Sequence, residues 1–191
     1  MLVVCTANVC RSPVAERLLR RAIGGRVDAH GDEWVVTSAG TAAGSAPLDR
    51  HTITAAAEAG IGLSDHVPRR ADPDVVATDG ADLVVTMARE HVRAIAVADP
   101  AAWPRTFTLK ELVRRAGAAG AWRPGESWAD WLRRIGEGRR TVELLGSDPG
   151  DDVADPYGLP ARHHAAMVAE VAAAVDDLVR LGPWPRSPPG R

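Results

Sequence analysis

The chain begins Met1-Leu2-Val3-Val4-Cys5-Thr6-Ala7-Asn8-Val9-Cys10-Arg11-Ser12-Pro13. The apolar run at residues 2–4 predicts a short buried strand, and Ser12–Pro13 predicts a helix start, because proline suits the first helical turn. A loop between a strand end and a helix start can aim its backbone N–H groups at one point, where the helix N-terminus favours an anion. This stretch therefore predicts an α/β fold with an anion site just beyond its first strand.

Strand-like and helix-like segments alternate along the rest of the chain. We expect further strands at residues 34–37, 83–86 and 106–109, and helices at residues 48–59, 89–98 and 162–181. Such alternation favours a parallel sheet with helices on both faces. Ser127 and Asp130 resemble a capping box, and a short helical stripe follows them, made of Trp128, Trp131, Leu132 and Ile135. We expect this stripe to pack against the domain, and residues 116–125 to be peripheral.

Length and charge limit the class of protein. The 191 residues and the net charge of −2 fit one domain, expected at residues 1–181, and give no reason to expect nucleic acid or a membrane as partner. No basic segment precedes a long apolar stretch, so we expect no secretory signal. Two cysteines suit a reducing cytoplasm better than a disulfide framework. Residues 182–191 hold four prolines without a core pattern, and we expect this tail to be disordered.

Cys5 and Arg11 are the candidate reactive groups of the first loop. The positive field of such a loop lowers the pKa of a thiol, so Cys5 could attack as a thiolate. The planar guanidinium of Arg11 can grip two phosphate oxygens. Attack of a thiolate on phosphorus needs no metal, but an acid must protonate the leaving oxygen. The alternative is that Cys5 is a buried structural thiol at a strand end.

The motif of residues 5–13, with Ala15 and Glu16 after it, resembles the signature of low-molecular-weight protein tyrosine phosphatases. Further matches follow in the family's order, at Ser38-Ala39-Gly40-Thr41, Gly60-Ile61, His66 with Arg69, Thr108-Leu109-Lys110-Glu111-Leu112 and Asp155-Pro156-Tyr157-Gly158. The resemblance implies a small doubly wound four-stranded parallel sheet and a phosphocysteine intermediate. It also implies no cofactor, a phosphorylated protein as substrate, a cytoplasmic location and a monomer or weak dimer. Residues 117–150 are longer than in the family.

The same resemblance assigns roles to individual residues. Cys5 attacks phosphorus, Arg11 binds the phosphoryl oxygens, and Asp155 acts first as general acid and then as base. Ser12 supplies a hydroxyl that stabilises the thiolate, and Tyr157 forms one wall of the cleft. The remaining substrate-binding residues are those of the loop, Thr6, Ala7, Asn8, Val9 and Cys10. Asn8, Ser38 and His66 match residues that brace the loop from behind.

Several positions depart from the family and leave alternatives open. Ala7 replaces a usual glycine, residues 42–45 lack an aromatic side chain, Gly158 replaces a second wall tyrosine, and Met87-Ala88 lacks the usual aspartate. We expect phosphotyrosine as substrate from the branched apolar Val9 and from Tyr157. The alternatives are a protein arginine phosphatase, which Gly158 and residues 108–112 favour, and a phosphate-binding module without catalysis. Arsenate reduction needs more cysteines than Cys5 and Cys10.

Two further expectations concern side chains outside this assignment. Cys10 either traps an oxidised Cys5 in a reversible disulfide or only fills the interior of the loop. His163 and His164 are adjacent, without the spacing of paired metal ligands, so we expect them on the solvent side of the last helix and expect no metal site.

Overall fold

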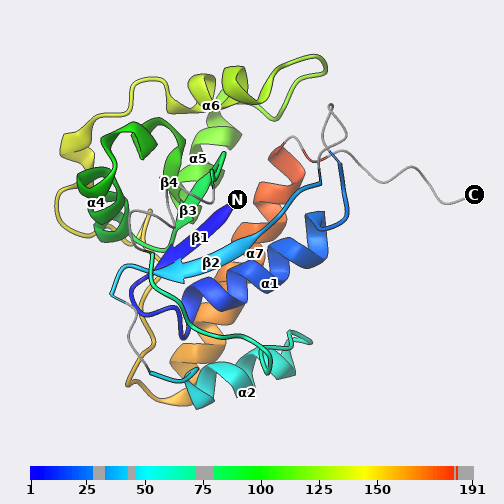
Figure 1. Ribbon diagram of the computed structural model, residues 1–191, viewed down its shortest axis with the longest axis vertical. Helices are drawn as coiled ribbons and strands as arrows, with labels where there is room; N and C mark the ends of the chain where they lie inside the picture. Colours follow the sequence, from blue (N-terminus) through cyan, green and yellow to red (C-terminus); the bar gives the residue numbers. More distant parts are fainter. Residues whose placement is uncertain (28–32, 43–45, 72–79, 183, 185–191) are drawn as a thin grey trace, which may run out of the picture.

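The computed structural model describes residues 1–27, 33–42, 46–71, 80–182 and 184. Its sheet contains four parallel strands in the order β2-β1-β3-β4 (Figure 1). The strands are β1 (Leu2–Cys5), β2 (Thr37–Gly40), β3 (Val84–Thr86) and β4 (Thr106–Thr108). The helices are α1 (Arg11–Ile23), α2 (Arg50–Glu58), α4 (Arg89–Ala98), α5 (Leu109–Ala119), α6 (Trp128–Gly136) and α7 (Ala161–Leu181), with 3₁₀ turns η1 (Pro100–Arg105) and η2 (Thr141–Leu144). The predicted doubly wound four-stranded sheet is confirmed.

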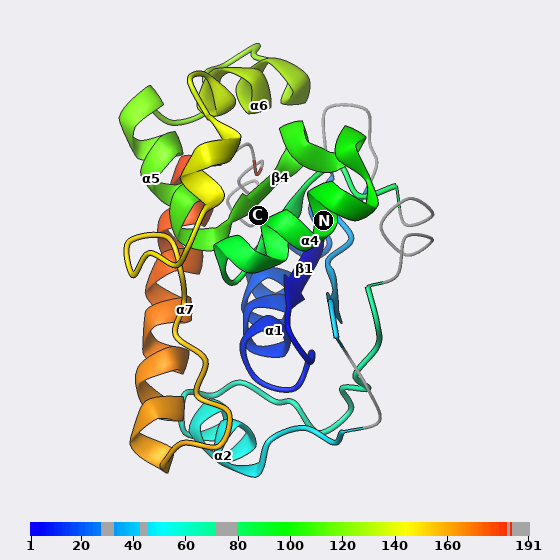
Figure 2. The ribbon, with the colours of Figure 1, turned by 90° about the vertical axis from the view of Figure 1, so that its left-hand side faces the viewer.

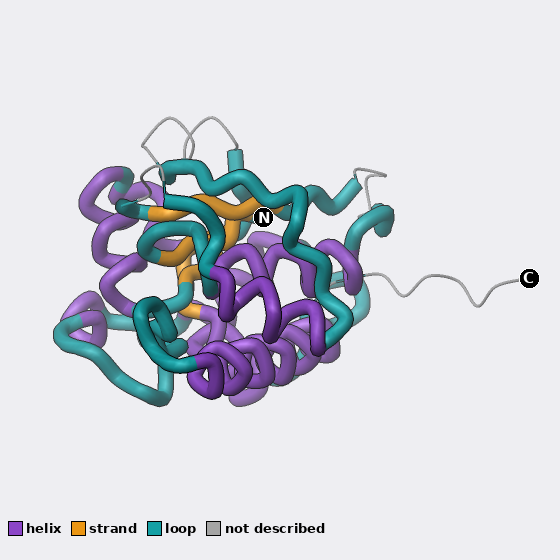
Figure 3. Tube along the Cα trace, turned by 90° about the horizontal axis from the view of Figure 1, so that it is seen from below, coloured by secondary structure: helices purple, strands orange, loops and turns teal. Residues whose placement is uncertain are grey.

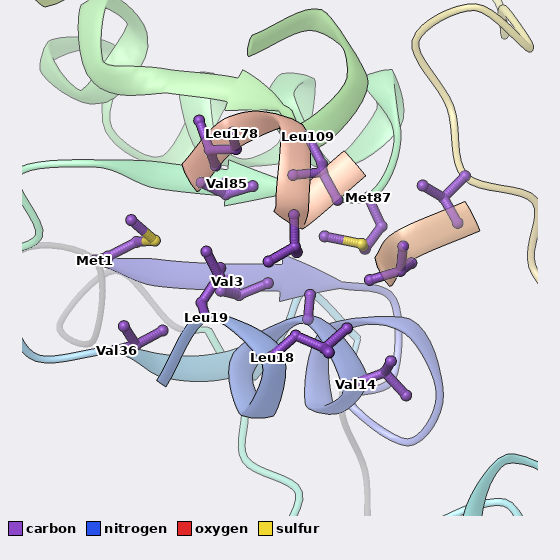
Figure 4. Close-up of a cluster of buried hydrophobic side chains, with 14 of the residues drawn as sticks. Met1, Val3, Val14, Leu18, Leu19, Val36, Val85, Met87, Leu109 and Leu178 are labelled. Carbon is purple, nitrogen blue, oxygen red and sulfur yellow. The ribbon is translucent and has the colours of Figure 1, made fainter. Parts of the chain in front are cut away.

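Successive side chains of the central strand enter two different cores, because strand side chains alternate between faces. Val3 and Cys5 belong to the main core, which contains buried side chains of α1, α5 and α7. Leu2 and Val4 belong to a second core with Ile95 of α4. Figure 4 shows Val3 among side chains of the main core, and Figure 3 shows the strands, in orange, with helices to either side. Apolar residues on both faces explain why β1 is a continuous hydrophobic run.

Helix α7 is a central element of the main core. It packs against α1, α2 and α5, and Figures 1 and 2 show it running alongside α1. Its buried stripe is Met167, Val168, Val171, Val175 and Leu178, as its 3.6-residue periodicity predicts. Each such side chain stabilises the fold by about 1.5–3 kcal/mol relative to exposure. The helix thereby fixes α1, whose N-terminus adjoins the first loop.

Two elements differ from the expectation. The second strand begins at Thr37, opposite Leu2, and not at Trp34. Trp34 instead stacks edge-on against Trp128 and Trp184, so its burial reflects aromatic packing outside the sheet. Helix α5 was not expected, although Thr108 and Glu111 form a complete capping box at its start. Ala116, expected to be peripheral, is fully buried on this helix.

The helical stripe formed by Trp128, Trp131, Leu132 and Ile135 packs against the domain, as expected. Ser127 accepts the backbone N–H of Asp130 at the start of α6, and Trp131 and Ile135 are buried in the main core. In the tail, Trp184 is buried and donates its indole N–H to the carbonyl of Leu178. The expected disorder of residues 182–191 is therefore wrong at Trp184, and residues 183 and 185–191 lie outside the described part of the chain. Within that part, none of the helices is long and apolar enough to cross a membrane.

Candidate active site

The loop that follows β1 is clamped against the end of β2. Thr41 donates its backbone N–H to the carbonyl of Cys5 at 2.9 Å, and Ala42 donates to the carbonyl of Thr6 at 2.8 Å. Gly40 lies so close that a Cβ there would be 2.7 Å from the carbonyl oxygen of Thr6 and 2.9 Å from the amide nitrogen of Asn8. The loop can therefore lie this close to the sheet only because residue 40 has no side chain.

The sulfur of Cys5 lies inside this loop. Cys5 is 2% exposed, and its Sγ is 3.3 Å from the donating backbone N–H of Asn8 and 3.0 Å from the hydroxyl of Ser12. The Ser12 oxygen accepts an N–H from the Asn8 amide at 2.9 Å, and the Ser12 hydrogen can go to the sulfur or to the carbonyl of Ala39 at 3.5 Å. Two donor groups therefore lie beside this sulfur, just before the N-terminus of α1.

Arg11 and Asp155 form an ion pair across the mouth of the loop. The Arg11 Nη2 donates to Asp155 Oδ2 at 2.6 Å and to the hydroxyl of Thr6 at 2.9 Å, and its Nη1 donates to the carbonyl of Val153 at 3.2 Å. Arg11 is 3% exposed, whereas the Asp155 side chain is 44% exposed. Tyr157 donates its backbone N–H to Asp155 Oδ1 at 3.2 Å, and its side chain is exposed. The structure thus brings Arg11 and Asp155 together from 144 positions apart in the chain.

Asn8 is the centre of the support behind the loop. It is fully buried with a φ of 58°, a left-handed conformation that asparagine tolerates better than most residues. Its side-chain N–H groups go to the hydroxyls of Ser12 and Ser38, and its carbonyl oxygen accepts the backbone N–H of Arg69 at 3.0 Å. The ring Nε2 of His66 lies 3.2 Å from the same oxygen. All hydrogen-bonding positions of the Asn8 amide are therefore satisfied, which fixes the strained backbone.

Glu16 completes this network, and sequence reasoning gave it no role. Ser38 donates its hydroxyl to Glu16 Oε2 at 2.6 Å, and the ring Nδ1 of His66 lies 3.7 Å from the same oxygen. Burial lowers the pKa of His66, although the negative charge of Glu16 opposes that shift. The signal that could have found Glu16 is its place in the motif that begins at Cys5, one helical turn after Ser12.

His91 is a second residue that sequence reasoning missed. Its Nε2 lies 3.0 Å from the hydroxyl of Thr6. Burial lowers the pKa of His91 to about 3, together with the cations of Arg11 and Arg93. The ring is therefore neutral and forms a hydrogen bond with the Thr6 hydroxyl, which also accepts from Arg11. His91 thus orients a hydrogen-bond partner of Arg11.

The remaining loop residues divide by burial. Ala7 is half-buried, whereas the side chains of Val9 and Cys10 are each 2% exposed and belong to the main core. Burial raises the pKa of the Cys10 thiol to about 12. This environment favours the interpretation that Cys10 fills the interior of the loop. Of residues 42–45, only Ala42 lies in the described part of the chain.

The prediction for His164 was wrong. His163 is exposed, as expected, but His164 is fully buried and its ring Nδ1 lies 2.8 Å from the hydroxyl of Thr52. Its Nε2 lies 3.2 Å from the carbonyl of Leu159. Two polar partners compensate the burial of this ring. Adjacent positions on a helix differ by about 100° in direction, which is why His163 can be exposed while His164 is buried.

Known proteins are similar to this chain over its sequence and its fold. The model of the family "Low molecular weight phosphotyrosine protein phosphatase" matches residues 1–121. The protein-tyrosine-phosphatase Etp of Escherichia coli is 33% identical over 101 residues, which cover 52% of this chain and 62% of that relative's length. The crystal structure of a low molecular weight protein tyrosine phosphatase from T. tengcongensis is 28% identical, with a TM-score of 0.63 and coverage of 94% of this chain and 96% of that one. The YwlE arginine phosphatase of Geobacillus stearothermophilus is 26% identical, with a TM-score of 0.64 and coverage of 94% and 89%. Because the family model matches more than half of the sequence, the chain belongs to the low molecular weight phosphotyrosine protein phosphatase family.

Proposed function

We propose that this protein is a cysteine-dependent phosphatase that hydrolyses phosphotyrosine in proteins. The observation that carries the proposal is the Cys5 sulfur, which lies beside two donor groups in the loop, together with the ion pair that Arg11 at the start of the following helix makes with Asp155. We assign Cys5 as nucleophile, Arg11 as phosphate clamp and Asp155 as general acid. A binding module without catalysis would not need a half-exposed carboxyl group beside the clamp.

The reaction proceeds in two steps. The Cys5 thiolate attacks phosphorus, the bond to the leaving oxygen breaks, and Asp155 gives that oxygen a proton. Asp155 then takes a proton from the water that attacks phosphocysteine, which releases phosphate and restores the thiolate. Arg11 exchanges its contact with Asp155 for phosphoryl oxygens when substrate binds, which frees the carboxyl group to face the leaving oxygen. The hydroxyl of Ser12 stabilises the thiolate as it re-forms.

Tyr157 supports an aromatic substrate. Tyr157 is 61% exposed, and its backbone N–H is hydrogen-bonded to Asp155, so the residue lies next to the acid. An exposed aromatic ring at this position can stack on the phenyl group of phosphotyrosine. The Etp relative is named as a tyrosine phosphatase, in agreement with this choice. Phosphoarginine is the second candidate, because the similar YwlE structure is titled an arginine phosphatase and Gly158 adds no second wall.

The test compares kcat/KM for matched phosphotyrosine and phosphoarginine peptides, because specificity is a ratio of these constants. We expect the phosphotyrosine peptide to be the better substrate. A preference for phosphoarginine would transfer the function to the second candidate. Cys5→Ser should abolish turnover on both peptides. Arg11→Lys should also lose activity, because lysine lacks the planar fork that grips two phosphate oxygens. Absence of turnover by the wild-type chain on phosphate esters and on phosphoarginine would instead favour a binding module.

The proposal also includes a cytoplasmic location, a single domain over residues 1–181 and a monomer or weak dimer. Sedimentation of the full chain over a range of concentrations tests the last of these. A tight dimer at the lowest concentration would contradict it.

A further inference from the structure

Three side chains that can bind a metal meet beside the phosphate loop. A ligand atom from each of Cys10, Asp49 and His164 lies within 4.8 Å of the other two. Cys10 precedes α1, Asp49 caps the N-terminus of α2, and His164 lies in the first turn of α7. The fold assembles them from distant parts of the sequence, which explains why no ligand spacing is visible there.

The imidazole of His164 is oriented as a metal ligand requires. Its Nε2 lies 3.2 Å from the carbonyl of Leu159, which can only accept, so in the neutral ring Nε2 carries the hydrogen. The lone pair is then on Nδ1, which faces the cluster and lies 3.3 Å from Asp49 Oδ1. A carbonyl that fixes the other ring nitrogen is the usual outer partner of a metal-binding histidine. At present the hydroxyl of Thr52 contacts Nδ1, at 2.8 Å.

The dimensions suit a small cation. Two ligands at about 2.05 Å from a tetrahedral ion are roughly 3.3 Å apart, which matches the His164–Asp49 separation. The Cys10 sulfur lies within 4.8 Å of both atoms, which is at most about 1.3 Å beyond the separation of roughly 3.5 Å that tetrahedral ligands would have. Cys10 and His164 are buried, whereas the side chain of Asp49 is 18% exposed, so a cation would reach the site from solvent at Asp49.

The charges also balance. A thiolate and a carboxylate together neutralise a divalent cation, so the occupied site would carry no net charge in the interior. Sulfur and imidazole ligands select zinc-like ions over magnesium or calcium, which prefer oxygen.

We propose that Cys10, Asp49 and His164 form a binding site for a thiophilic divalent cation such as Zn²⁺, with water as the fourth ligand. On binding, the Cys10 thiol loses its proton to solvent, a metal–sulfur bond forms, and the Thr52 hydroxyl releases Nδ1. The ion joins the phosphate loop to α2 and α7 at the residue before Arg11. This site does not depend on the proposed phosphatase activity.

The test uses Co²⁺ as a spectroscopic substitute for Zn²⁺ in a Cys5→Ser chain, which removes the other thiol. We expect a thiolate-to-cobalt charge-transfer band that saturates at about one ion per chain and that Zn²⁺ abolishes. Adding Cys10→Ser should remove the band, and adding His164→Asn should weaken Co²⁺ binding at least about tenfold. The adjacent, exposed His163→Asn is the matched control and should leave the affinity unchanged.

Three results would overturn the proposal. They are no band in the Cys5→Ser chain, a band that survives Cys10→Ser, and equal weakening by the two histidine variants. Because a variant of a buried ligand can misfold, X-ray absorption on the Zn²⁺-loaded Cys5→Ser chain provides a second measurement. We expect one sulfur at about 2.3 Å with nitrogen and oxygen neighbours, and a shell without sulfur would contradict the site.

Discussion

Replacement of Gly40 by alanine tests how closely the catalytic loop depends on the sheet. The added Cβ would lie 2.7 Å from the carbonyl oxygen of Thr6, 2.8 Å from the carbonyl carbon of Ala7 and 2.9 Å from the amide nitrogen of Asn8. Gly40 cannot retreat, because its N–H donates to Arg69 and its carbonyl accepts from Ala71, at 2.9 and 2.8 Å. The loop must therefore move, by about 0.7 Å if contacts relax to roughly 3.5 Å.

This displacement should affect both activity and stability. Overpacking of this kind costs about 1–3 kcal/mol of unfolding free energy. A misplacement of about 1 Å can lower the rate about 100-fold, so we expect Gly40→Ala to lower kcat/KM on an aryl phosphate by roughly 10–100-fold. Denaturant unfolding and steady-state kinetics on the same preparation separate the two effects.

Gly117→Ala is the matched control. Gly117 lies in helix α5 and has nothing within 4 Å of an added Cβ. Alanine should stabilise this helix by about 0.5–1 kcal/mol and leave kcat/KM unchanged. If Gly40→Ala keeps activity within about twofold of Gly117→Ala, the close contact does not position the loop and the reasoning is refuted.

Three further predictions follow from the geometry of the site. Asp155→Ala should lower turnover about 10²–10⁴-fold for poor leaving groups and less for acidic phenols, and equal losses across a leaving-group series would contradict its role as acid. Because the pKa of His91 is lowered to about 3 in the folded protein, the unfolded chain binds the imidazole proton more tightly. The contribution of His91 to the free energy of unfolding is therefore present above about pH 6.5 and decreases as the pH falls toward 3. Between pH 6.5 and 5 the loss from this group is about 2 kcal/mol, and denaturant unfolding of His91→Asn should show a pH dependence reduced by that amount. Peroxide should oxidise Cys5 to sulfinic acid before Cys10 can attack, because a thiol with a pKa of about 12 is only about 10⁻⁵ thiolate at pH 7; prompt formation of a Cys5–Cys10 disulfide in a mass spectrum would contradict this.

The parts of the fold that follow from local patterns were predicted well. Residues 2–4 are apolar on both faces, and α7 carries its buried stripe at helical spacing, so both could be located from the sequence. The start of β2 could not, because β-branched residues at 35–37 resemble a strand whether or not a partner lies opposite them. Pairing with Leu2 decides that the strand begins at Thr37. The capping box of α5, formed by Thr108 and Glu111, is present in the sequence, but both residues also belong to the family motif at residues 108–112, which alone does not indicate a helix.

The site shows the same division between local and distant information. Cys5, Ser12 and Arg11 share one loop and one helix turn, so their proximity follows from the chain itself. His91 and Glu16 gain their roles only when the sheet order places α4 beside the loop and α1 beside β2. A buried neutral ring and a buried carboxylate are indistinguishable in sequence from surface residues of the same type, since burial is decided by packing. The residues that we propose to bind phosphate could therefore be found from their motif, whereas the residues that hold them in place required the fold.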